Sequence, residues 1–167
     1  ATAIVDDWHR ATSFSGLLAR VDELAAYLAS TGVSCGDNVG LLMHADLEFV
    51  VTLYAISKLG AVCVPIPTKY REPEVLSLVR AADLSSLVAG EEFETWAPSF
   101  EGLGVPVVWS RGVADGYGFA GLAGEGVTAE GGPEDPVIMM FTSGTTSAAK
   151  GVVLRNYNVC HAAMVYA

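Results

Sequence analysis

The chain has 167 residues, of which 51% are hydrophobic and 17% are charged, and this predicts one globular domain with a substantial core rather than a disordered chain. Nineteen acidic residues against nine Lys and Arg give a formal charge of −10, which disfavours nucleic acid as a partner because its backbone is bound by positive charge. Cys35, Cys63 and Cys160 lie far apart and lack metal-ligand spacing, so we predict buried or partly buried thiols and no metal site.

The most apolar long segment, residues 47–66, is a poor candidate for a membrane span. Glu48 and Lys58 interrupt it, and Gly60 and Pro65 break its helical pattern. The first ten residues also lack the basic and apolar parts of a secretory signal. We therefore expect no membrane span and a cytoplasmic location.

The amino-terminal half alternates between helical and strand patterns. Apolar residues at helical spacing predict a helix between Ser13 and Thr31, with Ser13 as its N-cap and Gly32 closing it. The short apolar run 38–43 predicts a buried strand.

A second helix is predicted from an Asp46 cap to Leu59, followed at once by a strand over 61–66. A strand, a helix and a strand with short joints form a βαβ unit, whose strands lie parallel. The residues expected to face inward from this helix are Phe49, Val50, Leu53, Tyr54 and Ile56.

The pattern then repeats, which predicts an α/β fold: βαβ units with a mainly parallel sheet flanked by helices. Residues 110–133 are rich in glycine and are expected to form a long surface loop. The further elements predicted are a helix from Pro73 to Ala82, a strand over 84–89, a short helix over 91–97, and strands over 105–109 and 137–141.

Residues 142–151 combine five hydroxyl side chains with glycine and Lys150, between the apolar strands 137–141 and 152–154. Backbone N–H groups, hydroxyls and an ammonium group in one tight connection suit the binding of phosphate. This is not the common P-loop, because a strand rather than a helix follows the lysine. The residues alone leave two interpretations open, a phosphate site and an ordinary polar hairpin.

The stretch 135–146, continued by 150–154, resembles the signature loop of the adenylate-forming enzymes: acyl-CoA synthetases, aryl-acid ligases, luciferases and the adenylation domains of peptide synthetases. The likeness extends over about residues 3–161. It implies that residues 1–167 are the amino-terminal part of an AMP-binding domain. The catalytic residues are then expected beyond residue 167, and we expect the chain alone to be inactive.

The resemblance implies a ligase that uses ATP and Mg²⁺ to convert a small carboxylic acid into an acyl-adenylate with release of pyrophosphate. A thiol then takes the acyl group, either that of CoA or the phosphopantetheine of a carrier protein. By position, the residues implied to bind the β- and γ-phosphates are Thr142, Ser143, Gly144, Thr145, Thr146 and Lys150.

The chain departs from the usual family pattern at three positions. Ser147 and Ala149 stand where the family usually has glycine and proline, and Asn156 stands where many relatives have histidine. A non-catalytic scaffold or assembly domain with a degenerate phosphate loop therefore remains as an alternative function. His9, His44 and His161 have no carboxylate or cysteine at a spacing that suggests catalysis, and we expect them to be surface or packing residues.

Overall fold

A computed structural model describes residues 1–6, 9–113, 116–118, 127–128, 131–142 and 150–166. Its main sheet has seven strands in the order β7-β6-β5-β3-β4-β8-β9. The five central strands are parallel, and β7 and β9 pair antiparallel at the two edges. The strands are β3 (Asn38–Leu42), β4 (Val62–Pro65), β5 (Ser86–Gly90), β6 (Val107–Val113), β7 (Gly116–Gly118), β8 (Pro136–Thr142) and β9 (Lys150–Arg155).

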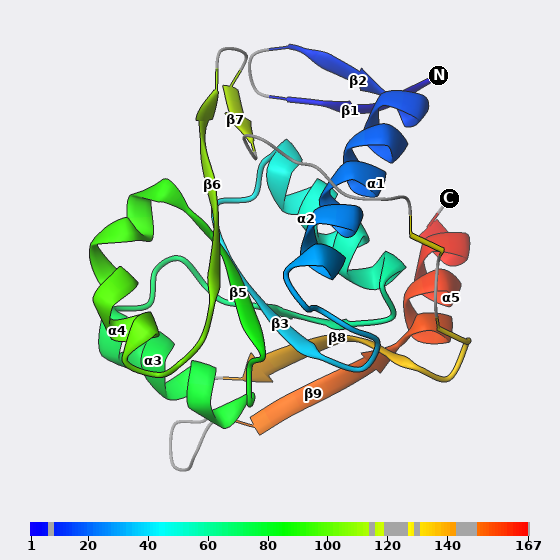
Figure 1. The fold of residues 1–167 in the computed structure, drawn as a ribbon. Coiled ribbons are helices and arrows are strands. Elements are labelled where there is room, and N and C mark those ends of the chain that lie inside the picture. The colour runs from blue at the N-terminus through cyan, green and yellow to red at the C-terminus, as the bar shows by residue number, and fades with distance from the viewer. Residues whose placement is uncertain (7–8, 114–115, 119–126, 129–130, 143–149, 167) are drawn as a thin grey trace.

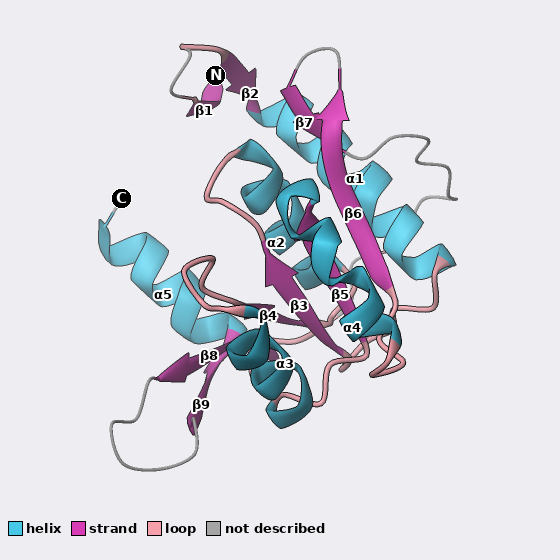
Figure 2. Cartoon of the chain, turned by 90° about the vertical axis from the view of Figure 1, so that its left-hand side faces the viewer, coloured by secondary structure: helices cyan, strands magenta, loops and turns pink. Residues whose placement is uncertain are grey.

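Helices cover both faces of the parallel strands (Figures 1 and 2). Alternate residues of β3 face opposite sides: Leu41 belongs to the core beneath α1 and α2, and Leu42 to the core beneath α3 and α4. This is the two-layered helix packing that buried parallel strands require. The helices are α1 (Phe14–Ser30), α2 (Leu47–Lys58), α3 (Glu72–Ala81), the 3₁₀ helix η1 (Glu91–Trp96), α4 (Ala97–Glu101) and α5 (Asn156–Tyr166).

The predicted helix ends are confirmed in atomic detail. The Ser13 hydroxyl accepts a hydrogen bond from the Gly16 N–H, and an Asp46 carboxylate oxygen accepts one from Phe49 N–H, each satisfying a backbone donor that the first turn leaves open. Gly32 follows α1 with φ of 102°, a backbone conformation that glycine adopts without steric cost. These caps fix where α1 and α2 begin and how α1 ends.

The α/β fold class, the parallel βαβ unit of β3, α2 and β4, and the order of the later elements are confirmed. The assignment of the inner face of α2 is partly wrong, because Tyr54 is 54% exposed. Phe49 and Leu53 pack against the core only partly buried. The fully buried positions are Glu48, Val51, Thr52, Ala55 and Ile56.

Three further expectations need correction. Cys63 is buried, but Cys35 and Cys160 are exposed. Strand β6 is longer than predicted, and β7 pairs with it inside the segment 110–133 expected to be loop. A separate two-stranded antiparallel sheet, β1 (Thr2–Val5) with β2 (Ala11–Ser13), was not expected from the sequence. Across the described residues, no helix is both long enough and apolar enough to cross a membrane.

Candidate functional site

The predicted phosphate loop joins two neighbouring antiparallel strands. Thr142, the last residue of β8, is opposite Lys150, the first residue of β9. The two ends of the loop are thereby held side by side at the edge of the sheet. As expected from the sequence, a strand follows the lysine, so no helix begins there whose N-terminal dipole could bind an anion.

Both described site residues are open to solvent. The Thr142 hydroxyl donates a long hydrogen bond of 3.5 Å to the Lys150 backbone carbonyl, which is at the weak limit for such a bond. The hydroxyl and the Lys150 ammonium group are therefore available to an incoming ligand at one edge of the sheet. The predicted residues Ser143, Gly144, Thr145 and Thr146, and the departures Ser147 and Ala149, lie outside the described residues.

Packing fixes the position of the strands that carry the loop. Met139 and Phe141 of β8 face the core beneath α3, and Gly151 of β9 lies opposite Phe141. A Cβ atom on Gly151 would meet both side chains at 3.4 Å, which leaves little room for any larger residue. The hydrophobic face of the hairpin is thus anchored in the core beneath α3.

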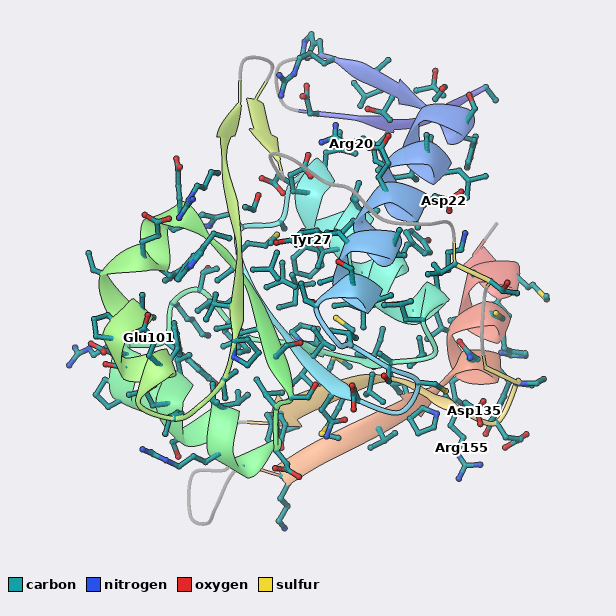
Figure 3. All side chains as sticks on the ribbon, in the orientation of Figure 1. Arg20, Asp22, Tyr27, Glu101, Asp135 and Arg155 are labelled. Carbon is teal, nitrogen blue, oxygen red and sulfur yellow. The ribbon has the colours of Figure 1, made fainter. Side chains whose placement is uncertain are left out.

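The opposite end of the hairpin is tied to the turn that precedes β8. The Asn156 side-chain amide donates to the Gly132 carbonyl at 3.0 Å, and Arg155 forms an ion pair of 2.7 Å with Glu134. Asp135 accepts a hydrogen bond from the Gly132 N–H at 2.6 Å. Figure 3 shows Asp135 and Arg155 close to where β9 meets α5. Asn156 therefore has a structural role at this end of the hairpin.

The residues next to the loop suit phosphate oxygens better than a divalent cation. The described residues contain no group of three His, Cys, Asp or Glu that could hold a metal ion. Thr142 and Lys150 supply a hydroxyl and an ammonium group, which are hydrogen-bond donors to oxyanions rather than typical Mg²⁺ ligands. We therefore assign none of the described residues to a metal.

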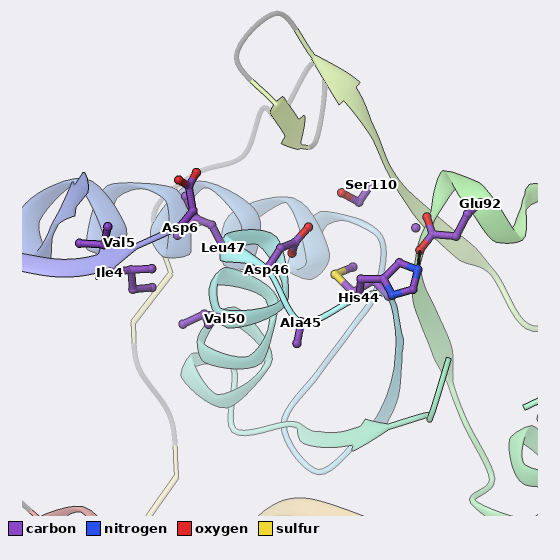
Figure 4. A pocket seen from close by; sticks show the side chains of 12 residues that line it. Ile4, Val5, Asp6, His44, Ala45, Asp46, Leu47, Val50, Glu92 and Ser110 are labelled. Atoms are coloured by element: carbon purple, nitrogen blue, oxygen red, sulfur yellow. Dashed lines mark ion pairs between the residues drawn. The ribbon is translucent and has the colours of Figure 1, made fainter. Parts of the chain in front are cut away.

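The structure also reveals a cavity that the sequence analysis missed. A cavity of about 600 Å³ lies at the carboxyl ends of β3 and β5, bordered by His44, Asp46, Glu92 and Ser110 (Figure 4). His44 Nε2 lies 3.7 Å from a carboxylate oxygen of Glu92, a residue 48 positions further along the chain. Sequence spacing could not pair them. The signal that was available is that both follow parallel strands, whose carboxyl ends meet at one edge of the sheet.

Comparison with known proteins assigns a family to this architecture. The profile of a family described as "AMP-binding enzyme" matches residues 1–167. The long-chain-fatty-acid–CoA ligase FadD13 of Mycobacterium tuberculosis is 31% identical over 162 residues, which cover 93% of this chain and 32% of that protein. The 4-chlorobenzoate–CoA ligase of an Arthrobacter species is 31% identical over 158 residues, covering 92% of this chain and 30% of that protein.

The fold of this chain also matches solved structures. The crystal structure of ATP-bound MatB from Rhodopseudomonas palustris superposes with a TM-score of 0.85 at 25% sequence identity, covering 98% of this chain and 33% of that one. The chain thus spans about a third of the length of the proteins that it matches.

Proposed function

The chain belongs to the AMP-binding enzyme family, and on that premise we propose that it supplies the phosphate-binding part of an ATP-dependent acid–thiol ligase. The proposal concerns the complete protein, because the chain spans only about a third of the length of its relatives. Relatives at 31% identity are CoA ligases for a long-chain fatty acid and for 4-chlorobenzoate. A small carboxylic acid is therefore the proposed substrate.

The proposed reaction has two steps. A carboxylate oxygen of the acid attacks the α-phosphorus of ATP, the bond from that phosphorus to the bridging oxygen breaks, and pyrophosphate leaves with the bond's electrons. A thiolate then attacks the acyl carbonyl of the adenylate and AMP leaves. We propose CoA as the acceptor because the relatives use it, with carrier-bound phosphopantetheine as the alternative. We also propose that the protein acts in the cytoplasm.

The proposed role of the β8–β9 loop is to stabilise the charge that develops on the departing pyrophosphate. Thr142, Ser143, Gly144, Thr145 and Thr146 supply hydroxyl and backbone donors, and Lys150 supplies a positive charge. Donors held in place before the reaction lower the barrier by roughly 3 kcal/mol each in comparable oxyanion sites. Mg²⁺ would share the phosphate charge when bound with ATP, and no residue of this chain is assigned to it.

One observation carries the proposal: Thr142 and Lys150 are adjacent, exposed and opposite each other at the end of an antiparallel hairpin anchored in the core. Two groups whose chemistry suits phosphate are thereby presented together at the end of the hairpin. The chain is acidic overall, so a local cation is needed where a polyphosphate is to bind. The ATP-bound state of the structural relative MatB supports the choice of nucleotide.

Exchange of radiolabelled pyrophosphate into ATP tests the proposal, because exchange reports formation of the adenylate without the thiol step. The complete protein is assayed with a panel of fatty, aryl and amino acids. We expect exchange that depends on one class of acid. A folded protein that supports no exchange with any acid would instead favour the scaffold alternative, in which Ser147 and Ala149 mark an unused loop.

A further inference from the structure

The cavity beside β3 and β5 lies at the point where the topology of the sheet reverses. Strand β3 leads into α2 on one face of the sheet, whereas β5 leads into η1 and α4 on the other. Because β3 and β5 are neighbours in the sheet, the chain leaves their carboxyl ends in opposite directions and opens a crevice between them. Such crevices are the preferred ligand sites of open α/β sheets.

The size of the cavity suits a small molecule. Its volume of about 600 Å³ falls within the range of roughly 300–1,000 Å³ that small-molecule sites occupy. Ile4, Leu47 and Val50 form an apolar wall on the side of β1 and α2, where Asp6 and Asp46 also lie, and Glu92 of η1 and Ser110 of β6 line the opposite side (Figure 4). The cavity therefore offers both contact area and a means to orient a ligand.

A hydroxyl group borders this cavity. Ser110 is only 3% exposed as a residue and lines the cavity. Its Oγ is not among the buried atoms that lack a hydrogen-bond partner in the described part of the chain, which belong to Glu48, Thr52 and Ser86, so we place it at the cavity surface. Ser110 is paired in register with Gly90 of β5, which has no side chain to cover it. The hydroxyl is thus accessible to a ligand in the cavity.

Gly90 also determines where a charge is placed. A Cβ atom at this position would overlap the Glu92 carboxylate, so the absence of a side chain lets Glu92 fold back over the end of β5. Its carboxylate there faces His44. The glycine therefore brings a carboxylate to the rim of the cavity that also contains the Ser110 hydroxyl.

The charges at the cavity favour a cation. Asp6 is balanced by an ion pair with Arg10 at 2.6 Å. Among the described residues, Glu92 forms an ion pair only with the His44 imidazole, and Asp46 accepts a hydrogen bond from the Phe49 N–H at the start of α2. Neither of these two carboxylates has a Lys or Arg partner among the described residues. An anionic ligand would be repelled here, whereas an ammonium group would be attracted by both carboxylates.

We propose that this crevice is a small-molecule site, separate from the β8–β9 loop, that binds an organic cation with an apolar body. Its ammonium group is held by Glu92 and Asp46, the Ser110 hydroxyl accepts a further hydrogen bond, and the apolar body packs on Leu47 and Val50. This inference does not depend on the proposed ligase activity.

Ligand-detected NMR titration of the complete protein with n-hexylammonium tests the proposal, with n-hexanol as the uncharged probe of the same shape. We expect saturable binding of the cation and binding of the alcohol that is about tenfold weaker. Glu92→Gln should weaken the cation about tenfold and leave the alcohol unchanged. Glu101→Gln is the charge-matched control, because Glu101 lies exposed on α4, away from the cavity (Figure 3), and it should change neither affinity.

Two variants that fill the cavity locate the site. Ser110→Leu places bulk at its base and Val50→Trp at its apolar wall, and either should abolish binding of both probes in a protein whose thermal unfolding shows that it is folded. Using both keeps the test decisive where one variant fails to fold. The proposal is overturned by absence of saturable binding, by equal effects of Glu92→Gln and Glu101→Gln, or by binding that survives a folded cavity-filling variant.

Discussion

Arg20 of α1 and Glu48 of α2 form an ion pair at the contact between the two helices. Glu48 is 3% exposed, and its Oε2 atom has no hydrogen-bond partner in the part of the chain that the structure describes. In a second pair between the same helices, Lys58 with Asp22 at 2.5 Å, the carboxylate side chain is 45% exposed, against 4% for that of Glu48. The two pairs differ in burial, and burial decides what the loss of one partner costs.

Replacing Arg20 by Ala should destabilise the protein by about 3 kcal/mol, because a buried carboxylate is left without its cation. Lys58→Ala is the matched control, and we expect it to cost less than about 1 kcal/mol because Asp22 remains hydrated. Urea unfolding of both variants measures the two losses. Equal losses would contradict the importance assigned to the burial of Glu48.

Glu48 should also make stability depend on pH. Burial raises the pKa of this carboxyl above its ordinary value of 4.5, and the attraction of Arg20 offsets the effect only in part. A folded-state pKa above the unfolded value means that the contribution to stability is full below about pH 4.5 and is lost as the pH rises through the folded pKa.

Glu48→Gln removes this titration, since glutamine stays neutral. We therefore expect the variant to become more stable relative to the original protein as the pH rises from 4 to 7. The difference between their free energies of unfolding, variant minus original, should increase over this range. Urea unfolding at the two pH values measures this change. A relative stability that moves in the opposite direction would show that the pair with Arg20, rather than burial, dominates the pKa.

Lys150 is the residue on which the proposed phosphate site depends most. Lys150→Ala should reduce kcat/KM for ATP in pyrophosphate exchange by about a hundredfold, which corresponds to the roughly 3 kcal/mol of one lost charge-stabilising donor. Lys150→Arg should restore part of the loss because it keeps the charge. Arg80→Ala, which removes an exposed cation from α3, should leave ATP kinetics unchanged. Unaltered kinetics in Lys150→Ala would refute the assigned role.

At the scale of elements, the β8–β9 loop carries the two departures from the usual family sequence. Serine in place of glycine costs about 1 kcal/mol wherever the glycine has a left-handed conformation. Alanine in place of proline leaves the unfolded and unbound loop freer, at a cost of roughly 0.5 kcal/mol. Both changes are expected to weaken the binding of phosphate without removing Lys150.

The double variant Ser147→Gly/Ala149→Pro should therefore bind ATP more tightly, by up to about tenfold if the two costs add. The KM for ATP in pyrophosphate exchange measures the gain, with each single variant as its control. Weaker binding of ATP by the double variant would contradict this expectation. It would indicate that Ser147 and Ala149 suit the loop of this chain better than glycine and proline do.

Most elements could be predicted because their signals are local. Ser13 and Asp46 cap the helices that follow them, and the apolar runs that became β3 and β5 are bounded by turn residues. The inner face of α2 could not be assigned in this way, since apolar residues occur around much of the helix and the charged Glu48 occupies a buried position. The short strands β1 and β2 were missed because their few residues carry too little pattern.

Across the whole molecule, the sequence indicated one candidate site and missed another. The loop at 142–150 is contiguous in the chain and carries a recognisable pattern, so its position at the end of a hairpin could be foreseen. The crevice that joins His44, Glu92 and Ser110 depends on which strands become neighbours and on which face each helix packs. That information is a property of the sheet order and not of any local spacing.

We propose that the hairpin of β8 and β9 binds the phosphates of ATP. A crystal structure of the complete protein with ATP would show where the triphosphate lies. We predict β- and γ-phosphate oxygens at hydrogen-bond distance, about 3 Å, from the Lys150 ammonium group and from donors of residues 142–146. A triphosphate bound elsewhere, with Lys150 in contact only with solvent, would contradict the account.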